Sequence, residues 1–232
     1  MRKFNRKNDQ IRDISIETNI NKNSEGSCII RLGDTHVICT ASFENDVPQW
    51  LKNSDSGWIT AEYNMLPGSS GSRISRKSFE SGRSKEISRL IGRSLRAVCT
   101  LGVINGYSFT VDCDVLEADG GTRTASINGA WIALNDTFEK MIQENKLIQN
   151  PLSSKVGALS VGIVDGELVA DLDYENDSKA EVDLNLVLNQ DFDILEIQGT
   201  AEGKPFSKSH LDNLFELAKE NIEEIFKIQD KN

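Results

Sequence analysis

The sequence of 232 residues contains no long hydrophobic run. A helix that spans a membrane needs about 18 or more consecutive apolar residues, and no segment of this chain approaches that length. The first seven residues are polar, whereas a secretory signal peptide carries an apolar stretch. We therefore expect a soluble, cytoplasmic protein with no membrane partner, and a chain long enough to bury a sizeable core.

Cysteine and histidine are too few and too scattered for most sites that are built from them. The four cysteines form no CxxC pair and no zinc-ligand pattern, so we interpret them as buried free thiols in a reducing compartment. The two histidines are His36, in a strand-like segment, and His210, at the start of a predicted helix. A ribonuclease mechanism that uses two histidines is therefore disfavoured.

Several common catalytic motifs are also missing from the sequence, namely the P-loop, GxSxG and HExxH. Without them, catalysis would have to rest on arginine side chains, backbone amides and carboxylates. Such groups suit phosphoryl transfer by electrostatic positioning better than covalent catalysis.

The net charge of −10 at first argues against an RNA partner, because neutralising phosphates supplies much of the affinity for nucleic acids. The charges are unevenly distributed, however. Basic residues gather in 1–12 and 73–96, and acidic residues gather in 171–203. This separation fits a protein that holds a polyanion on one surface and metal ions on another, and it also fits ordinary solvated faces of opposite sign.

The sequence predicts several strands and helices in each half of the chain, so a similar succession occurs twice. The first half predicts a β-hairpin over 27–43, strands at 57–63 and 107–116, and helices from Arg83 and over 122–144. The second half predicts strands at 156–164, 167–172, 181–188 and 193–199, and an amphipathic helix over 211–226. Residues 67–82, rich in serine and glycine, predict a mobile loop. The whole indicates an α+β or α/β layered fold with helices covering the sheets.

A glycine pair separates a predicted strand from a predicted helix in the segment Ala118–Thr124. Helix N-termini present unpaired amides and partial positive charge, and glycine lets an anion approach that backbone. The threonine and arginine that follow, Thr122 and Arg123, would add a hydroxyl and a bidentate fork. A phosphate cradle is one interpretation, and a plain turn before the helix is the other.

Two further segments carry groups of the right kind. Arg83 lies in the first turn of a predicted helix, where it could close on the same anion or could be an exposed arginine at a helix end. Asp177 and Asp183 lie in an acidic stretch at the edge of a strand. Carboxylates of this kind suit Mg²⁺, which usually binds one or two of them plus substrate phosphates. An acidic loop of no special purpose is the alternative.

Together these segments resemble the ribonuclease PH family. The matching strings cover nearly the whole chain in one order: Glu25–Ser27, Gly33–Thr35, Cys39–Ser42, Gly57–Tyr63, Met65–Pro67, Glu86–Arg96, Asp112–Leu116, Ala118–Ser126, Ser160–Val164 and Glu196–Gly203.

The resemblance implies an α+β fold like domain 2 of ribosomal protein S5, with two βα halves and mixed sheets covered by helices. It implies a single catalytic domain over 1–232, with internal halves at about 1–150 and 151–232. It also implies a homo-oligomer, a hexameric ring built as a trimer of dimers. In the implied reaction, inorganic phosphate attacks the last phosphodiester of RNA and releases a nucleoside diphosphate. The implied RNA substrate is chiefly the 3′ trailer of precursor tRNA, with degradation of other RNA besides.

The resemblance also implies roles for single residues. Phosphate as co-substrate would be bound by Arg83, Gly121, Thr122 and Arg123. The cofactor Mg²⁺ would be held by Asp177 and Asp183, or these two would act in acid–base catalysis. The catalytic set would thus be Arg83, Arg123, Asp177 and Asp183.

The resemblance matches Arg73 and Arg76 to loop arginines that help to hold RNA. The chain departs from the family pattern near its start, where Phe4–Arg6 replaces a usual Asp-Gly-Arg and Asp13 replaces a proline, and in the loop at Arg76-Lys77. These changes bear on RNA affinity and length preference. Two other functions stay open: a non-catalytic ring subunit that binds RNA or scaffolds partners, and another phosphate-using enzyme such as a small-molecule kinase.

Overall fold

A computed structural model describes residues 2–231 of the chain. Its first half forms a five-stranded sheet with the strand order β1-β2-β3-β5-β4. The strands are β1 (Ile14–Thr18), β2 (Gly26–Leu32), β3 (Thr35–Glu44), β4 (Trp58–Met65) and β5 (Ser108–Glu117). Neighbouring strands run antiparallel except β4 and β5, which are parallel, so this sheet is mixed.

The second half forms a four-stranded sheet with the order β7-β6-β8-β9. The strands are β6 (Val156–Val164), β7 (Glu167–Ala170), β8 (Val182–Asn189) and β9 (Ile194–Ala201). Every pair in this sheet is antiparallel, so the expectation of mixed sheets holds for the first sheet and not for the second. The parallel pair occurs only where a helix crosses over between two strands, and that crossover lies between β4 and β5.

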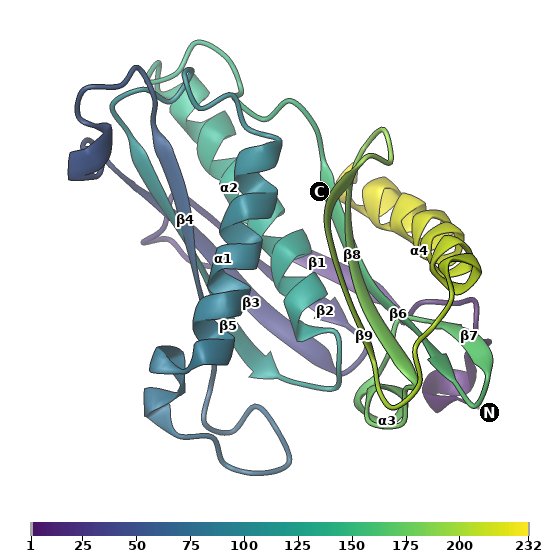
Figure 1. Ribbon diagram of the computed structural model, residues 1–232. Coiled ribbons are helices and arrows are strands. Elements are labelled where there is room, and N and C mark those ends of the chain that lie inside the picture. Colours follow the sequence, from purple (N-terminus) through teal and green to yellow (C-terminus); the bar gives the residue numbers. More distant parts are fainter. Residues whose placement is uncertain (1, 232) are drawn as a thin grey trace.

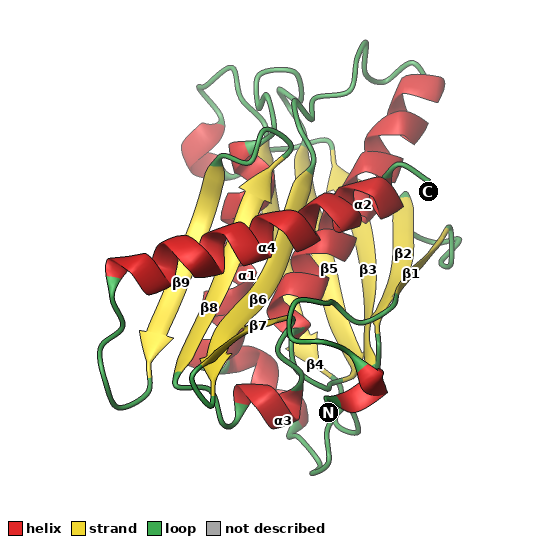
Figure 2. Ribbon diagram, turned by 90° about the vertical axis from the view of Figure 1, so that its right-hand side faces the viewer, coloured by secondary structure: helices red, strands yellow, loops and turns green. Residues whose placement is uncertain are grey.

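Sheets and helices alternate in four layers (Figure 1). The helices are α1 (Gly82–Ala97), α2 (Thr122–Gln143), α3 (Tyr174–Asp177) and α4 (Lys208–Gln229), and short 3-10 helices span η1 (Lys3–Asn5), η2 (Gln49–Leu51) and η3 (Arg76–Glu80). Helices α1 and α2 lie between the two sheets, and α4 covers the outer face of the second sheet, as Figure 2 shows. The predicted α+β fold of the ribosomal protein S5 domain 2 type is confirmed.

Helix α2 can lie between two sheets because most of its side chains are buried and many of them are small. Its buried residues include Ala125, Ala130 and Ala133. A Cβ at Gly129 would lie 2.7 Å from Cys39 Sγ, so a larger residue would push β3 away. Toward the second sheet, Asn128 Nδ2 donates to the Ala158 carbonyl (3.0 Å) and Asn128 Oδ1 accepts from the Ala158 amide (2.8 Å). One helix thus holds both sheets, and the sheets meet at its N-terminal end.

The predicted elements recur in the structure with small shifts at their ends, whereas β1, α3 and the three short 3-10 helices were not predicted. Strand β1 and the single turn α3 carry too few residues for a clear period. Within the stretch expected to be a mobile loop, the side chain of Ser75 accepts a hydrogen bond from the Lys77 amide and caps η3. The four cysteines are free thiols as expected, three of them buried and Cys99 half-buried.

Across residues 2–231, none of the helices combines the length and the apolar character that crossing a membrane requires.

Candidate active site

The segment between β5 and α2 has a backbone that only glycine adopts easily. Gly120 and Gly121 have φ angles of 75° and 68°, in the left-handed region that side chains disfavour. A Cβ at Gly120 would also lie 2.5 Å from the Leu172 carbonyl oxygen, so the loop and the segment after β7 touch backbone to backbone. Gly121 is the N-cap of α2 and offers no side-chain cap. The first amides of α2 therefore point toward whatever lies in front of the helix, which is the geometry of an anion site.

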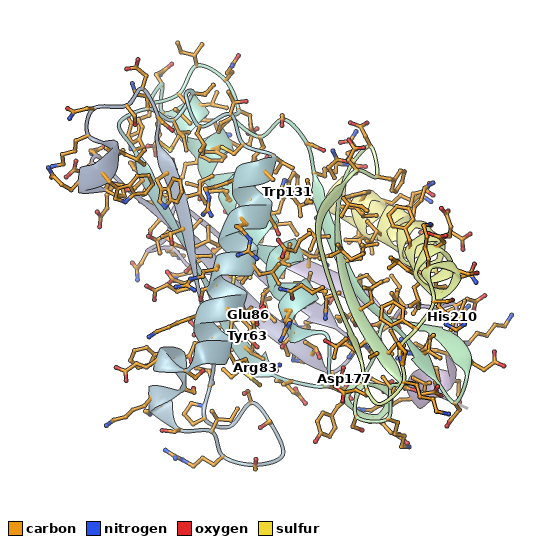
Figure 3. All side chains as sticks on the ribbon, in the orientation of Figure 1. Tyr63, Arg83, Glu86, Trp131, Asp177 and His210 are labelled. Atoms are coloured by element: carbon orange, nitrogen blue, oxygen red, sulfur yellow. The ribbon has the colours of Figure 1, made fainter. Side chains whose placement is uncertain are left out.

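In front of this loop lies a cleft of about 310 Å³. All six residues predicted to bind phosphate or metal line it: Arg83, Gly121, Thr122, Arg123, Asp177 and Asp183. Figure 3 shows Arg83, on α1, and Asp177, on α3, at the same end of the molecule. His210, on α4, lies on the far side of the second sheet. Residues about 100 positions apart in sequence thus meet in one cleft, and neither histidine lines it.

Arg123 is held by residues from both halves of the molecule. Its Nη1 donates to Oε1 of Gln198 on β9 (3.1 Å), and its Nη2 lies 3.4 Å from Oε2 of Glu86 on α1. Gln198 Nε2 donates in turn to Glu86 Oε1 (3.0 Å), which closes the triangle. The guanidinium is therefore oriented before any ligand arrives. Sequence reasoning missed Glu86 and Gln198 as site residues, although both lie in strings that carry the family resemblance.

Arg83 lies exposed in the first turn of α1, whose N-cap Ser81 accepts a hydrogen bond from the Ser84 amide. Within residues 2–231, its guanidinium has no hydrogen bond or ion pair of its own. Arg83 lines the same cleft as Asp177 and Asp183, and its charge opposes the rise in pKa that burial causes at both carboxyls. Arg83 is thus a cation of the cleft with free donors.

The two carboxylates of the cleft, Asp177 and Asp183, form no ion pair among residues 2–231, although Arg83 and Arg123 line the same cleft. Asp177 ends α3 at the exposed rim, and Asp183 is half-buried on β8. Burial raises the pKa of Asp183 to about 6, and the charge of Asp177 adds to this while Arg123 and Arg83 oppose it. Burial likewise raises the pKa of Asp177. Asn185 Nδ2 lies 3.5 Å from Asp183 Oδ1. Both carboxylates are therefore destabilised in their charged form, which is the condition that a bound cation relieves.

These two carboxylates fit Mg²⁺ because that ion needs only one or two protein carboxylates beside substrate phosphates and water. Among the described residues there is no group of three or more histidine, cysteine, aspartate or glutamate side chains that could form a complete metal cage. The remaining ligands of an ion at Asp177 and Asp183 would thus come from the substrate and from water.

Thr122 is held by Tyr63, a residue that sequence reasoning did not select although it lies in a string that carries the family resemblance. Tyr63 on β4 is buried, and its hydroxyl lies 2.9 Å from Thr122 Oγ1. Burial raises the pKa of Tyr63, so it stays a neutral phenol that can donate to Thr122. Ser160, which begins a string of the family resemblance, also lines the cleft, as do Ser70, Tyr174 and Asn185, which no motif marks. Asn185 lies two residues after Asp183 on β8, so its side chain is on the same side of the strand, and this spacing is a signal in the sequence that could have identified it.

The basic stretches do not all lie where the charge pattern suggested. Arg73 and Arg76 are exposed, on the segment between β4 and α1, but they are not among the residues that line the cleft. Ser70 of the same segment does line it, so this segment borders the cleft. Arg6 and Arg12, by contrast, are buried and cannot belong to a surface for a polyanion. Both arginines instead form buried ion pairs within the protein.

Comparisons with known proteins agree with this geometry. Residues 10–138 match the model of domain 1 of the 3′ exoribonuclease family (RNase PH), and residues 155–221 match the model of its domain 2. The chain belongs to this family. The predicted resemblance to ribonuclease PH is thereby confirmed at the level of the family, and the cleft lies where the two family domains meet.

Solved structures of similar fold include chains of archaeal exosomes and rice Rrp46. An Archaeoglobus fulgidus exosome with RNA bound to the active site matches at 22% identity and a TM-score of 0.81, over 97% of this chain and 90% of that one. Rice (Oryza sativa) Rrp46 matches at 18% identity and a TM-score of 0.79, over 97% and 96% of the two chains. An archaeal exosome core matches at 21% identity and a TM-score of 0.76, over 97% and 88%. At these identities the likeness concerns the fold.

Proposed function

We propose that this protein is a phosphate-dependent 3′-to-5′ exoribonuclease that releases nucleoside diphosphates. One observation carries the proposal: a single cleft combines two arginines and a glycine loop from the first family domain with two aspartates from the second. The first set suits inorganic phosphate, and the second suits a cation or proton transfer beside a phosphodiester. Phosphorolysis needs both sets at once.

In this proposal, Arg83, Arg123 and the first amides of α2 hold inorganic phosphate beside the last linkage of the RNA. A phosphate oxygen attacks the phosphorus of that linkage, a new P–O bond forms, and the bond to the 3′ oxygen of the preceding residue breaks. The products are one nucleoside diphosphate and an RNA shorter by one residue. Placing two anions together is the main difficulty, and fixed positive groups reduce it.

Asp177 and Asp183 lie on the second-sheet side of the same cleft. The departing 3′ oxygen must gain a proton, and a carboxyl whose pKa is raised to about 6 carries one in part of the molecules near neutral pH. When Mg²⁺ is bound by this pair, it would offset negative charge on the phosphates. Asn185 would orient the Asp183 carboxylate in either case.

We further propose that the protein acts as a ribonuclease PH rather than as a subunit of an exosome. On this view residues 1–232 form one catalytic domain, six copies assemble into a ring as a trimer of dimers, and the substrate is the 3′ trailer of precursor tRNA in the cytoplasm. Arg73 and Arg76 would help to hold that RNA. The presence of both the arginine pair and the aspartate pair in one chain supports a copy that is active without a different partner chain.

The direct test is to incubate the purified protein with single-stranded RNA and Mg²⁺, with and without inorganic phosphate, and to analyse the released nucleotides. Nucleoside diphosphates that form only with phosphate are the expected result. Nucleoside monophosphates that form without inorganic phosphate would show that the enzyme is a hydrolase and would contradict the proposal. RNA that stays bound and intact would favour the non-catalytic ring subunit.

The matching variant is Arg123→Ala, which removes the oriented guanidinium from the cleft. We expect turnover to fall by about 10³-fold or more while RNA binding changes little, because a phosphate-holding charge acts on the reaction rather than on the RNA. Arg93→Ala is the control, since Arg93 is exposed on α1 and pairs with Glu196. An Arg123→Ala enzyme as active as the control would overturn the assignment.

A further inference from the structure

Arg12 is the largest fully buried side chain of the described residues, and its side chain has 0% exposure. Burying a charged group is costly unless partners compensate for it at every donor. Burial by itself lowers the pKa of Arg12, but the hydrogen bonds and charge of Asp171 outweigh it and the pKa is raised. The guanidinium thus stays charged inside the protein, and its partners show what it holds in place.

One end of the Arg12 guanidinium binds the glycine loop. Its Nη1 donates to the Asp119 carbonyl (2.6 Å), and its Nη2 donates to the Gly120 carbonyl (3.3 Å). Thr35 completes this attachment, because its Oγ1 accepts from the Asp119 amide (2.9 Å) and donates to the Gly120 carbonyl (2.7 Å). The two residues that precede Gly121 are therefore fixed through their backbone on the side away from the cleft.

The other end of the guanidinium binds Asp171, directly after β7. Arg12 Nε donates to Asp171 Oδ2 (2.8 Å), Nη2 donates to Oδ1 (2.6 Å), and the Arg12 amide donates to Oδ2 (2.8 Å). Asp171 itself is 1% exposed and has a φ of 53°, an uncommon conformation for a residue other than glycine. One arginine thus joins the glycine loop of the first half to a tightly held residue of the second half.

The second contact leads on to the cleft. Arg6 bridges Asp171 and Asp173, with 2.8 Å to each carboxylate. Asp173 caps α3 by accepting from the Asn176 amide (3.0 Å), and α3 ends at Asp177. The chain of contacts therefore runs from the glycine loop through Arg12, Asp171 and Asp173 to a carboxylate of the cleft. Arg12 does not line that cleft, so it acts behind the site.

We propose that Arg12 is a positioning residue that sets the glycine loop against the segment carrying Asp177, and so fixes the phosphate site. This inference rests on the proposed function, which requires both sides of the cleft at a set separation. A purely structural role would make Arg12 important for stability alone. The two views differ in what they predict for phosphate affinity in a folded variant.

The test uses Arg12→Lys in the full chain, with Arg6→Lys as its matched control. Lysine keeps the charge but loses the fork that reaches two carbonyls and a carboxylate together. Arg6 is buried in the same ionic cluster but contacts only the aspartate side of it. Its replacement should loosen Asp171 and Asp173 without releasing the glycine loop, which Arg12 and Thr35 hold. The measurements are the affinity for inorganic phosphate by calorimetry, the KM for phosphate and kcat in phosphorolysis, the Kd for RNA, and the thermal midpoint.

We expect Arg12→Lys to weaken phosphate binding and raise its KM by about tenfold or more, with RNA affinity within about twofold of the wild type. Arg6→Lys should lower the thermal midpoint by a similar amount yet leave phosphate affinity within about twofold. Phosphate affinity that is unchanged in both variants, or lowered equally in both, would overturn the proposal.

A second variant keeps the test decisive if Arg12→Lys does not fold. Thr35→Val removes the hydroxyl that holds Asp119 and Gly120 and that accepts from Arg12 Nη1 (3.4 Å), but it removes no charged group, and it should weaken phosphate binding by about threefold. An unchanged affinity in Thr35→Val would then count against the proposal. A wild type that binds phosphate but releases no nucleoside diphosphate would sink the proposed function while leaving the Arg12 comparison valid, and a wild type that binds no phosphate would sink both.

Discussion

Four aspartates between residues 171 and 183 behave as two different pairs. Asp171 and Asp173 have side chains with 1% exposure and are bound by Arg6, and Asp171 also by Arg12. Asp177 and Asp183 border an open cleft with no ion pair among the described residues. Burial disfavours the charged form of Asp173, but the hydrogen bonds of Asn176 and the charge of Arg6 outweigh it and lower the pKa of Asp173. In Asp183 burial prevails and raises the pKa to about 6.

The cations packed around a carboxylate decide its role. A carboxylate in ion pairs with buried arginines stabilises the fold, and one without such a pair can bind a ligand. Both pairs lie in one acidic stretch and have the same side chain. Only the first pair has arginines within contact distance. The second pair is only partly compensated, by the more distant charges of Arg83 and Arg123, and a metal ion or a proton can compensate the rest.

The largest effect should come from Asp171→Asn. Asparagine tolerates the positive φ, so the change removes charge with little backbone strain. It leaves Arg12 and Arg6 buried with one carboxylate fewer, and breaking a buried ion pair in this way costs about 4 kcal/mol of the free energy of unfolding. Chemical denaturation measures this loss. Asp165→Asn is the control because Asp165 also has a positive φ but lies in an exposed turn. A loss below about 1 kcal/mol would show that the two pairs do not differ as described.

The converse variant is Asp183→Asn, in the cleft. We expect phosphorolysis to fall by about 10²-fold to 10³-fold, a loss of about 3 to 4 kcal/mol of transition-state stabilisation, because the group takes part in proton transfer or cation binding. Stability should stay the same or rise, since the removed carboxylate was destabilised by burial. Single-turnover assays and denaturation on the same samples separate the two effects. A variant that loses stability without losing activity would reverse the comparison.

Asp136 on α2 offers a smaller test, free of any role in the cleft. Burial and the charge of Glu139 raise its pKa from 3.8 to about 6. Because the folded pKa is raised, its stabilising contribution is full below pH 3.8 and is lost as the pH rises through about 6. Asp136→Asn should therefore stabilise the protein by about 1 kcal/mol at pH 8, after allowance for the exposed part of the side chain, and by almost nothing near pH 4. Denaturation at the two pH values decides this, and an equal effect at both would refute it.

Much of the fold and the residues of the cleft could be predicted because their signals are local. The glycine pair before a helix and the alternation of strands lie within short windows of sequence. The contacts that orient the site do not: Gln198 reaches Arg123 from another sheet, and Tyr63 reaches Thr122 from an edge strand. Arg12 was read as part of a basic surface because nothing in a window of a few residues shows that its partner Asp171 lies far along the chain.

Helix α2 packs against β2 and β3 on one side and β6 on the other, and residues of β6 and β8 join the same apolar core as the first sheet. Neither sheet can keep that core without the helix. Heat should therefore unfold the whole chain in one cooperative transition instead of melting one half before the other. A core shared in this way leaves no hinge between the two sheets, so an RNA that binds as proposed would have to thread into a cleft whose two walls do not move apart.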